Sequence, residues 1–192
     1  MPVSRSYVTV VSGMPRSGTS LMMRMLDVGG IPALTDGHRS ADRHNPHGYF
    51  EDERARRLAN DSSWIEEARG KGVKIIYRLL PHLPPHLDYR VLFMERDLEE
   101  VFDSQQDMLL SAENPAAGQD RAGMIRALAA DLESARRWLA CQKNIRRLDV
   151  PYAGVIADAV LWTDRVSQFL GGGLDQAAMA AVVEPALYRH RK

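Results

Sequence analysis

The chain has little of several features that mark specialised classes of protein. Its 192 residues include a single cysteine, Cys141, so no disulfide can form within the chain. The 25 lysines and arginines balance 25 aspartates and glutamates, which leaves no net charge for coating nucleic acid. No apolar stretch approaches membrane-spanning length, and the opening residues are too polar for a secretory signal. We therefore expect a cytoplasmic protein with no membrane span and no nucleic-acid partner.

What the chain does contain is an ordinary globular composition, 45% apolar and 26% charged, and enough residues for one domain with a real core. Short β-branched runs indicate strands, and apolar residues spaced three and four apart indicate helices. The expected strands are residues 7–12, 31–34, 73–80, 91–94 and 147–153. The expected helices are residues 19–28, 52–69 with a break near 61–63, 97–110, 121–142, 157–170 and 176–183. This alternation predicts a single α/β domain over residues 1–192, with a mainly parallel sheet flanked by helices. Residues 35–49 and 111–118 are expected loops, and the first is long enough to be functional.

The glycine-rich stretch at residues 11–20, VSGMPRSGTS, lacks one residue of a nucleotide-triphosphate loop. It follows a strand and opens a helix, as the motif G-x-x-x-x-G-[KR]-[ST] requires, but Thr19 replaces the cation. Gly13 and Gly18 permit a tight turn and a close approach of an anion to the amides that open the helix. Arg16 supplies a cation from within the loop. Because the chain also lacks an apolar strand ending in a metal-binding acid, we expect a phosphate bound without Mg²⁺.

A second candidate phosphate site follows another expected strand. Arg96 ends that strand, and Ser104 lies eight residues later on the next helix. Eight helical residues rise about 12 Å, so both side chains reach one extended ligand only if Arg96 precedes the helix and reaches back. Arginine offers a fork of donors suited to phosphate. Taken alone, pairing of Arg96 with Glu95 or Glu99 would be the simpler interpretation.

Together, PRSGTS and the strand–Arg96–x7–Ser104 pattern resemble the two phosphate motifs of the sulfotransferase family. NPHGYFE at residues 45–51, LLPHLP and the ending FLGG-x-LD…LYRHR also resemble stretches of bacterial members. The resemblance implies a P-loop-type, three-layer fold that binds 3′-phosphoadenosine 5′-phosphosulfate (PAPS) without a metal. It implies transfer of the sulfuryl group to a hydroxyl or amine of a small or larger acceptor, which leaves 3′-phosphoadenosine 5′-phosphate (PAP).

By that resemblance, each phosphate motif holds one end of PAPS. The 5′ phosphosulfate end would be held by loop residues, namely Arg16, Ser17, Gly18, Thr19 and Ser20. The 3′-phosphate would be held by Arg96 and Ser104, with cations added by the terminal LYRHR. Tyr152 would contact the adenine, or would instead be a half-buried packing residue.

The catalytic groups are less plainly marked. Arg16 is suited to neutralise charge on the bridging oxygen during transfer. Many family members use a histidine as the base, in a Lys-Thr-His-like stretch that ends the strand before the Arg96 strand, and residues 77–79 stand about there. Since they include no histidine, Glu51 at the end of NPHGYFE is our first candidate for the base. Lys74 would either face the ligand or lie solvated at the sheet edge. The other candidates are histidines, namely His44, His47, His82 and His86.

Two other functions stay open from the sequence. A P-loop kinase or NTPase would bind ATP with Mg²⁺, which the missing loop lysine disfavours. A non-catalytic protein that binds PAP or a related nucleotide would share the site but show no turnover. The chain is also short beside many relatives, so either the acceptor is large and partly exposed or a partner, such as a second copy in a homo-oligomer, completes its pocket.

Overall fold

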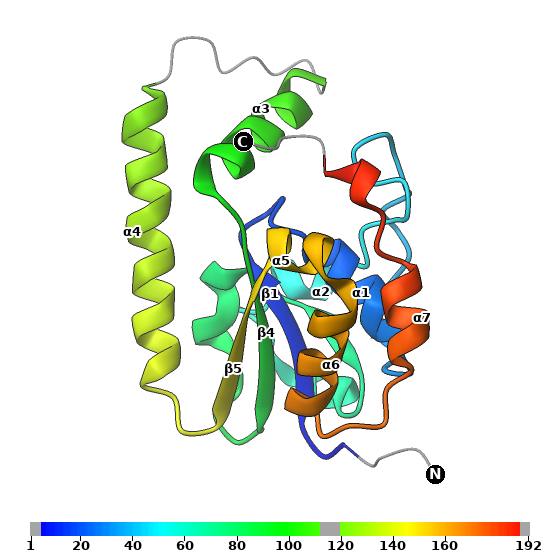
Figure 1. Cartoon of the computed structure of the whole chain (residues 1–192). Helices are drawn as coiled ribbons and strands as arrows, with labels where there is room; N and C mark the ends of the chain where they lie inside the picture. Colours follow the sequence, from blue (N-terminus) through cyan, green and yellow to red (C-terminus); the bar gives the residue numbers. More distant parts are fainter. Residues whose placement is uncertain (1–4, 112–119, 189–192) are drawn as a thin grey trace.

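The computed structural model describes residues 5–111 and 120–188. In this part of the chain a five-stranded sheet forms the centre, made of β1 (Val8–Gly13), β2 (Ala33–Leu34), β3 (Gly72–Lys74), β4 (Tyr89–Glu95) and β5 (Ile145–Pro151). The strand order is β2-β3-β1-β4-β5, and all four pairings are parallel (Figure 1). The loop expected at 111–118 and the tail beyond Tyr188 lie, apart from residue 111, outside the described residues.

Both faces of this sheet are buried, which explains why its central strands read as continuous apolar runs. Every residue of β1 is buried. Val10 belongs to one hydrophobic cluster together with Val91 and Phe93 of β4. Val11 belongs to the cluster on the opposite face, together with Leu92. Successive side chains of a strand therefore enter different halves of the core, as the period of two requires.

Helices cover each face of the sheet. One face carries α1 (Thr19–Val28), α5 (Tyr152–Ala157), α6 (Ala159–Phe169) and α7 (Gln176–Ala181). The other face carries α4 (Arg121–Ala140) and two 3₁₀ helices, Ser63–Ala68 and Tyr77–His82. The α/β fold with a parallel sheet between helical layers, expected from the sequence, is confirmed. None of the helices in the described ranges is long and apolar enough to cross a membrane.

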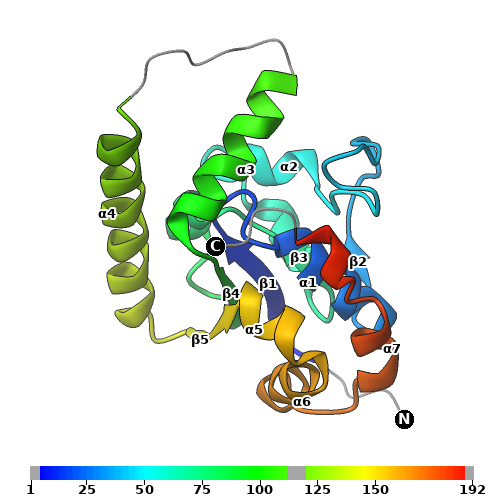
Figure 2. The same cartoon turned by 45° about the horizontal axis from the view of Figure 1, so that its top comes forward.

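The strand order creates a crevice at one edge of the sheet. From β1 the chain passes through α1 to β2 on one side, whereas from β4 it passes through α3 (Leu98–Ser111) and α4 to β5 on the other. The segments that follow β1 and β4 therefore diverge, and in open parallel sheets ligands bind at such a point, beyond the carboxyl ends of the strands. Figure 2 turns this edge towards the viewer.

The strand expected at residues 73–80 is wrong in its extent. β3 ends at Lys74, and the apolar residues after Ile76 form the 3₁₀ helix Tyr77–His82. Tyr77 and Leu80 are both buried, and their spacing of three suits a 3₁₀ turn rather than a strand. A run of apolar residues alone does not distinguish these two periods.

Other boundaries also differ from expectation by a few residues, and three of the differences occur at a residue that caps or breaks an element. The helix expected at 52–69 is reduced to α2 (Glu53–Arg56) and the 3₁₀ helix Ser63–Ala68, because Asp61 accepts the amide of Ser63 and opens a new turn. β5 stops at Pro151, after which α5 begins with Tyr152. Asp158 then caps α6 by accepting the amide of Leu161, so the helix expected at 157–170 starts two residues later.

Candidate functional site

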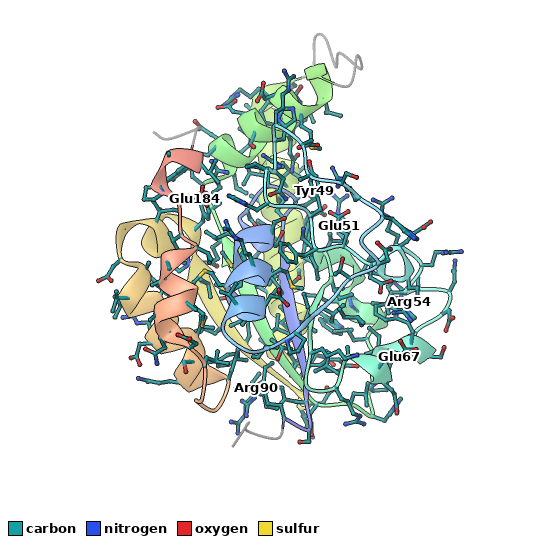
Figure 3. The ribbon with its side chains drawn as sticks, turned by 90° about the vertical axis from the view of Figure 1, so that its right-hand side faces the viewer. Tyr49, Glu51, Arg54, Glu67, Arg90 and Glu184 are labelled. Carbon is teal, nitrogen blue, oxygen red and sulfur yellow. The ribbon has the colours of Figure 1, made fainter. Side chains whose placement is uncertain are left out.

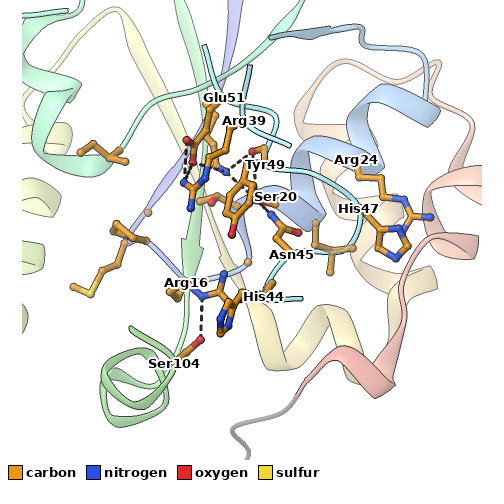
Figure 4. Close-up of a pocket in the computed structure, with 18 of the residues that line it drawn as sticks. Arg16, Ser20, Arg24, Arg39, His44, Asn45, His47, Tyr49, Glu51 and Ser104 are labelled. Atoms are coloured by element: carbon orange, nitrogen blue, oxygen red, sulfur yellow. Dashed lines mark hydrogen bonds and ion pairs between the residues drawn. The ribbon is translucent and has the colours of Figure 1, made fainter. Parts of the chain in front are cut away.

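A cavity of about 340 Å³ lies at this carboxyl edge of the sheet (Figure 4). One part of its wall is formed by Arg96, Ser104 and the residues 13–20 that follow β1, of which all but Ser17 line the cavity, and we call this part the loop end. Another part is formed by four charged residues, Arg39, Glu51, Arg56 and Lys74, which we call the Glu51 end. The further lining comes from the segment at 44–49, α3 and the C-terminal segment at 182–187.

The loop after β1 has a backbone that its residue types explain. Gly13 (φ +142°) and Gly18 (φ +100°) lie in the region that favours glycine. A Cβ at Gly13 would lie 2.7 Å from the carbonyl oxygen of Met94, and one at Gly18 would lie 2.4 Å from Cδ2 of Tyr152. Arg16 also has a positive φ (+77°), which is strained for a residue with a side chain. The loop therefore depends on two glycines and holds one arginine in a costly conformation, which is typical of a binding site.

The Arg16 side chain joins three parts of the wall. Its Nε donates to Ser104 Oγ of α3 at 3.0 Å, and its Nη2 donates to the carbonyl oxygen of His44 at 3.0 Å. Burial lowers the pKa of this guanidinium, because a charged group is less stable away from water. Ser104, predicted to act together with Arg96, thus lies against the loop after β1 in the folded chain.

Arg96 lies between the end of β4 at Glu95 and the start of α3 at Leu98. This is the position that the sequence requires if Arg96 and Ser104 are to contact one ligand. Arg96 Nη1 donates to the carbonyl oxygen of Arg16 at 3.0 Å, and Arg96 Nε pairs with Glu100 at 3.0 Å. The guanidinium carbon is 5.0 Å from the ring centre of Tyr152 and 5.1 Å from that of Tyr188. The two rings meet edge to face at 5.0 Å. Arg96 is therefore held by an acid and two aromatic rings beside the phosphate loop.

Two tyrosines, Tyr152 of α5 and Tyr188 of the C-terminal segment, pack at this site. Tyr152 is buried, where one interpretation of the sequence made it half-buried. Its ring packs against Gly18 of the loop. The hydroxyl of Tyr188 donates to Glu100 at 2.7 Å, and burial raises the pKa of Tyr188 to about 12. The resemblance placed the LYRHR segment, which begins at residue 187, near Arg96, but it singled out neither the Tyr188 hydroxyl nor its partner Glu100.

The three hydroxyl residues of the loop have different surroundings. Ser17 is buried and does not line the cavity. Thr19 and Ser20 do line the cavity. Ser20 Oγ accepts from Lys74 Nζ at 2.9 Å and from Asn45 Nδ2 at 2.8 Å. The first turn of α1 is thus tied to β3 and to the long segment that precedes Glu51.

Lys74 ends β3 with its ammonium group inside the cavity wall. Its side chain is only 9% exposed, which contradicts the alternative of a solvated lysine at the sheet edge. Nζ donates to the carbonyl oxygen of Tyr49 at 2.6 Å and lies 3.6 Å from Glu51 Oε1. Burial lowers the pKa of Lys74 to about 8, an effect that the Glu51 carboxylate partly offsets.

Glu51 is surrounded by cations. Arg39 Nη1 lies 3.1 Å from Glu51 Oε2, Arg56 Nη2 lies 3.4 Å from the same oxygen, and Lys74 approaches the other oxygen. The Arg39 guanidinium also lies over the ring of Tyr49, 3.4 Å from its centre. Figure 3 shows Tyr49 and Glu51 close together. Arg39 was not predicted as a site residue, since nothing in the polar segment singles it out.

Only two of the four candidate histidines are at the cavity. His44 and His47 line it, and His47 Nε2 lies 2.8 Å from Glu184 Oε1. His82 and His86 are exposed and do not line the cavity, and His86 lies 3.0 Å from Glu66. Because β3 ends at Lys74, residues 77–79 belong to the 3₁₀ helix Tyr77–His82, and the end of this strand is followed at once by residues 75 and 76. Neither 74–76 nor 77–79 contains a histidine.

No protein-family model and no curated protein matches this chain. Its structure is similar to the sulfotransferase domain from the curacin biosynthetic pathway, with a TM-score of 0.59 and 10% sequence identity over 98% of this chain and 84% of that one. It is also similar to mouse sulfotransferase SULT7A1 complexed with PAP, with a TM-score of 0.46 and 14% identity over 96% of this chain and 64% of that one. At 10% identity, the first likeness shows that the chain has a sulfotransferase-like α/β fold.

Proposed function

We propose that this protein is a cytoplasmic sulfotransferase that moves a sulfuryl group from PAPS to an acceptor hydroxyl or amine without a metal. The observation that carries the proposal is the meeting of two motifs far apart in the sequence. Arg16 of the first motif donates to Ser104 of the second, and Arg96 donates to the Arg16 carbonyl, each at 3.0 Å. A ligand with two separated anionic groups needs two groups of anion-binding residues at one cavity, and these two motifs would supply them.

The loop end fits a ligand of this charge. The amides that open α1 and the Arg16 guanidinium suit the 5′ phosphosulfate, since helix N-termini and buried cations favour anions. Arg96 and Ser104 suit the 3′-phosphate. In this proposal Tyr152, packed on Gly18 and against Arg96, provides an aromatic surface for the adenine.

The contacts of Ser20 favour a metal-free reaction over a kinase or NTPase. In those enzymes the hydroxyl that ends the loop motif binds Mg²⁺. Here Ser20 Oγ accepts from the Lys74 ammonium at 2.9 Å, so a fixed positive charge lies beside the oxygen that would bind the ion. The loop also bears Arg16 in place of the missing lysine. We infer that arginine and lysine side chains supply the charge that a metal supplies in NTPases.

For the transfer itself we assign two residues. A bond forms between the acceptor oxygen or nitrogen and sulfur, while the bond from sulfur to the bridging phosphate oxygen breaks. Arg16 neutralises the charge that develops on that oxygen as PAP leaves. Glu51 accepts the acceptor's proton at its carboxylate, which lies within 3.6 Å of Arg39, Arg56 and Lys74.

A non-catalytic PAP-binding protein is the second candidate. The observation that favours it is the lack of a histidine at residues 77–79, about where the resemblance placed the base of many sulfotransferases. Such a protein would bind PAP as tightly but would not consume PAPS. Turnover therefore separates the two candidates.

The test of the proposal combines binding with turnover. Titration calorimetry of PAP should show that Arg16→Ala weakens binding by about 1–3 kcal/mol, which is typical of charge-assisted hydrogen bonds. Arg57→Ala is the control, because Arg57 is exposed and does not line the cavity. Incubation with ³⁵S-labelled PAPS and a mixture of hydroxyl and amine compounds should then yield a labelled product. PAP binding that is unaffected by Arg16→Ala would contradict the assigned loop, and PAP binding without turnover would favour the second candidate.

A further inference from the structure

The charged residues of the Glu51 end are ordered from the floor of the cavity to its mouth. The exposed fraction of the side chain rises from 9% at Lys74 to 27% at Glu51, 38% at Arg39 and 69% at Arg56. Lys74 is also the member bonded to the phosphate loop, through Ser20. A compound that entered this end would therefore pass the two arginines before it reached Glu51 and Lys74.

The cations at this end outnumber the acids that face them. Arg39, Arg56 and Lys74 all approach the single carboxylate of Glu51. Asp36 also faces Arg56 electrostatically, although its oxygens accept the amides of residues 38 and 53. Three cations against these two carboxylates leave one positive charge in excess. Asp52, the other acid of this wall, is paired with Arg54 outside the cavity.

The wall beside these charges is apolar. Ile76, Leu79 and Met108 line the same cavity. Ile76 is 40% exposed, one of few large apolar side chains so exposed in the described part of the chain. An exposed apolar residue at the lip of a cavity suits contact with the apolar body of a ligand.

We propose that the acceptor is a compound with a small apolar body and an anionic group, such as a carboxylate, which binds Arg39 and Arg56 at the mouth of the cavity. Its hydroxyl then reaches inward to Glu51 and Lys74. The planar forks of two arginines suit a carboxylate, which accepts two parallel hydrogen bonds from a guanidinium. The inference rests on the proposed function for the identity of the reaction, but the anion site itself can be tested separately.

The experiment compares an anionic probe, 3-hydroxybenzoate, with its uncharged methyl ester. Their affinities are measured by calorimetry at low ionic strength, with the protein saturated with PAP and without PAP. We expect the acid to bind at least about fivefold tighter than the ester. The double variant Arg39→Gln/Arg56→Gln should abolish this preference. Arg57→Gln should retain it. Arg57 is a matched control, because it follows Arg56 directly in the chain and is as exposed, at 67% against 69%.

The outcomes distinguish this inference from the proposed function. Equal affinities for acid and ester, no binding of either, or a preference that survives in the double variant would overturn the anion site. If the double variant fails to fold, Arg56→Glu at the exposed mouth should reverse the preference, and an unchanged preference would overturn the site. Failure to bind PAP would refute the proposed function alone, since the preference measured without PAP still decides whether the anion site exists.

Discussion

The loop end and the Glu51 end of the cavity are assembled from contacts of different range. At the loop end, Arg16 and Ser104 lie 88 residues apart in the sequence, and Arg96 reaches a carbonyl 80 residues away. At the Glu51 end, the two arginines lie 12 and 5 residues from Glu51. The loop end therefore depends on contacts between elements that are distant in the sequence. At the Glu51 end, by contrast, Arg39, Glu51 and Arg56 all lie within residues 39–56. A fixed ligand suits the first arrangement, and a ligand that differs among related proteins suits the second.

The largest effect that should separate the two ends is on stability. Arg96 and Glu100 are 8% and 6% exposed, so Arg96→Ala leaves a buried carboxylate without its arginine. We expect the free energy of unfolding to fall by about 3 kcal/mol. Urea denaturation measures it, and the double variant Arg96→Ala/Glu100→Gln should recover part of the loss because the buried charge is then removed as well. A loss no larger than that of the exposed Arg57→Ala would show that the loop end is not held by this pair.

Replacement of the proposed base should affect turnover and leave donor binding intact. Glu51→Gln removes the proton acceptor, and general bases contribute about 10²–10⁴-fold to rates. We expect kcat to fall at least about a hundredfold, while the affinity for PAP changes less than twofold because Glu51 does not touch the loop end. Steady-state kinetics and calorimetry on one preparation give both values. A matched loss of PAP affinity would mean that the two ends do not act separately.

Replacing a glycine by alanine at each end tests how closely the surrounding atoms pack against the backbone there. Gly18→Ala places a Cβ 2.4 Å from the Tyr152 ring, whereas Gly37→Ala, in the segment that leads to Glu51, meets no atom within 4 Å. Both have positive φ, so Gly37→Ala should cost about 1 kcal/mol of stability from backbone strain alone. We expect Gly18→Ala to cost about 1–2 kcal/mol more and to weaken PAP binding at least tenfold. Equal effects of the two replacements on urea denaturation would contradict the close packing at the loop.

The last comparison concerns the pH dependence that Lys74 adds at the Glu51 end. Burial lowers its pKa in the folded chain to about 8 from an ordinary value of 10.5. Between these two values the unfolded chain binds more protons than the folded one, so the contribution of Lys74 to the free energy of unfolding rises with pH. Lys74→Met should remove that rise. Urea denaturation of both proteins at pH 7.5, 9 and 10 checks it, and a constant difference between them would show that Lys74 titrates normally.

The local structure of the loop after β1 was predicted well, because its signals come from neighbouring residues. Two glycines at fixed spacing, the β-branched run before them and the helix Thr19–Val28 are all read from neighbouring residues, and the helix has the expected bounds. The contact between Arg16 and Ser104 was not predicted, because it depends on the parallel sheet that brings the ends of β1 and β4 together.

The Glu51 end was predicted less well because it depends on irregular segments. Glu51 and Lys74 were recognised as candidates, but the ring of cations was not, since the position of Arg39 depends on its stacking over Tyr49. Lys74 was placed within a longer strand, because the apolar residues after it do not show whether they form a strand or a 3₁₀ turn. Tyr188 reaches Arg96 only through the fold of the C-terminal segment.

The most direct test of the central claim is a calorimetric comparison of PAP with ADP, each with and without Mg²⁺. If arginine and lysine side chains replace the metal, and if Arg96 and Ser104 hold a 3′-phosphate, PAP should bind without Mg²⁺ and at least about tenfold tighter than ADP. Tenfold corresponds to about 1.4 kcal/mol. Equal affinity for the two nucleotides, or binding that strictly requires Mg²⁺, would contradict the account.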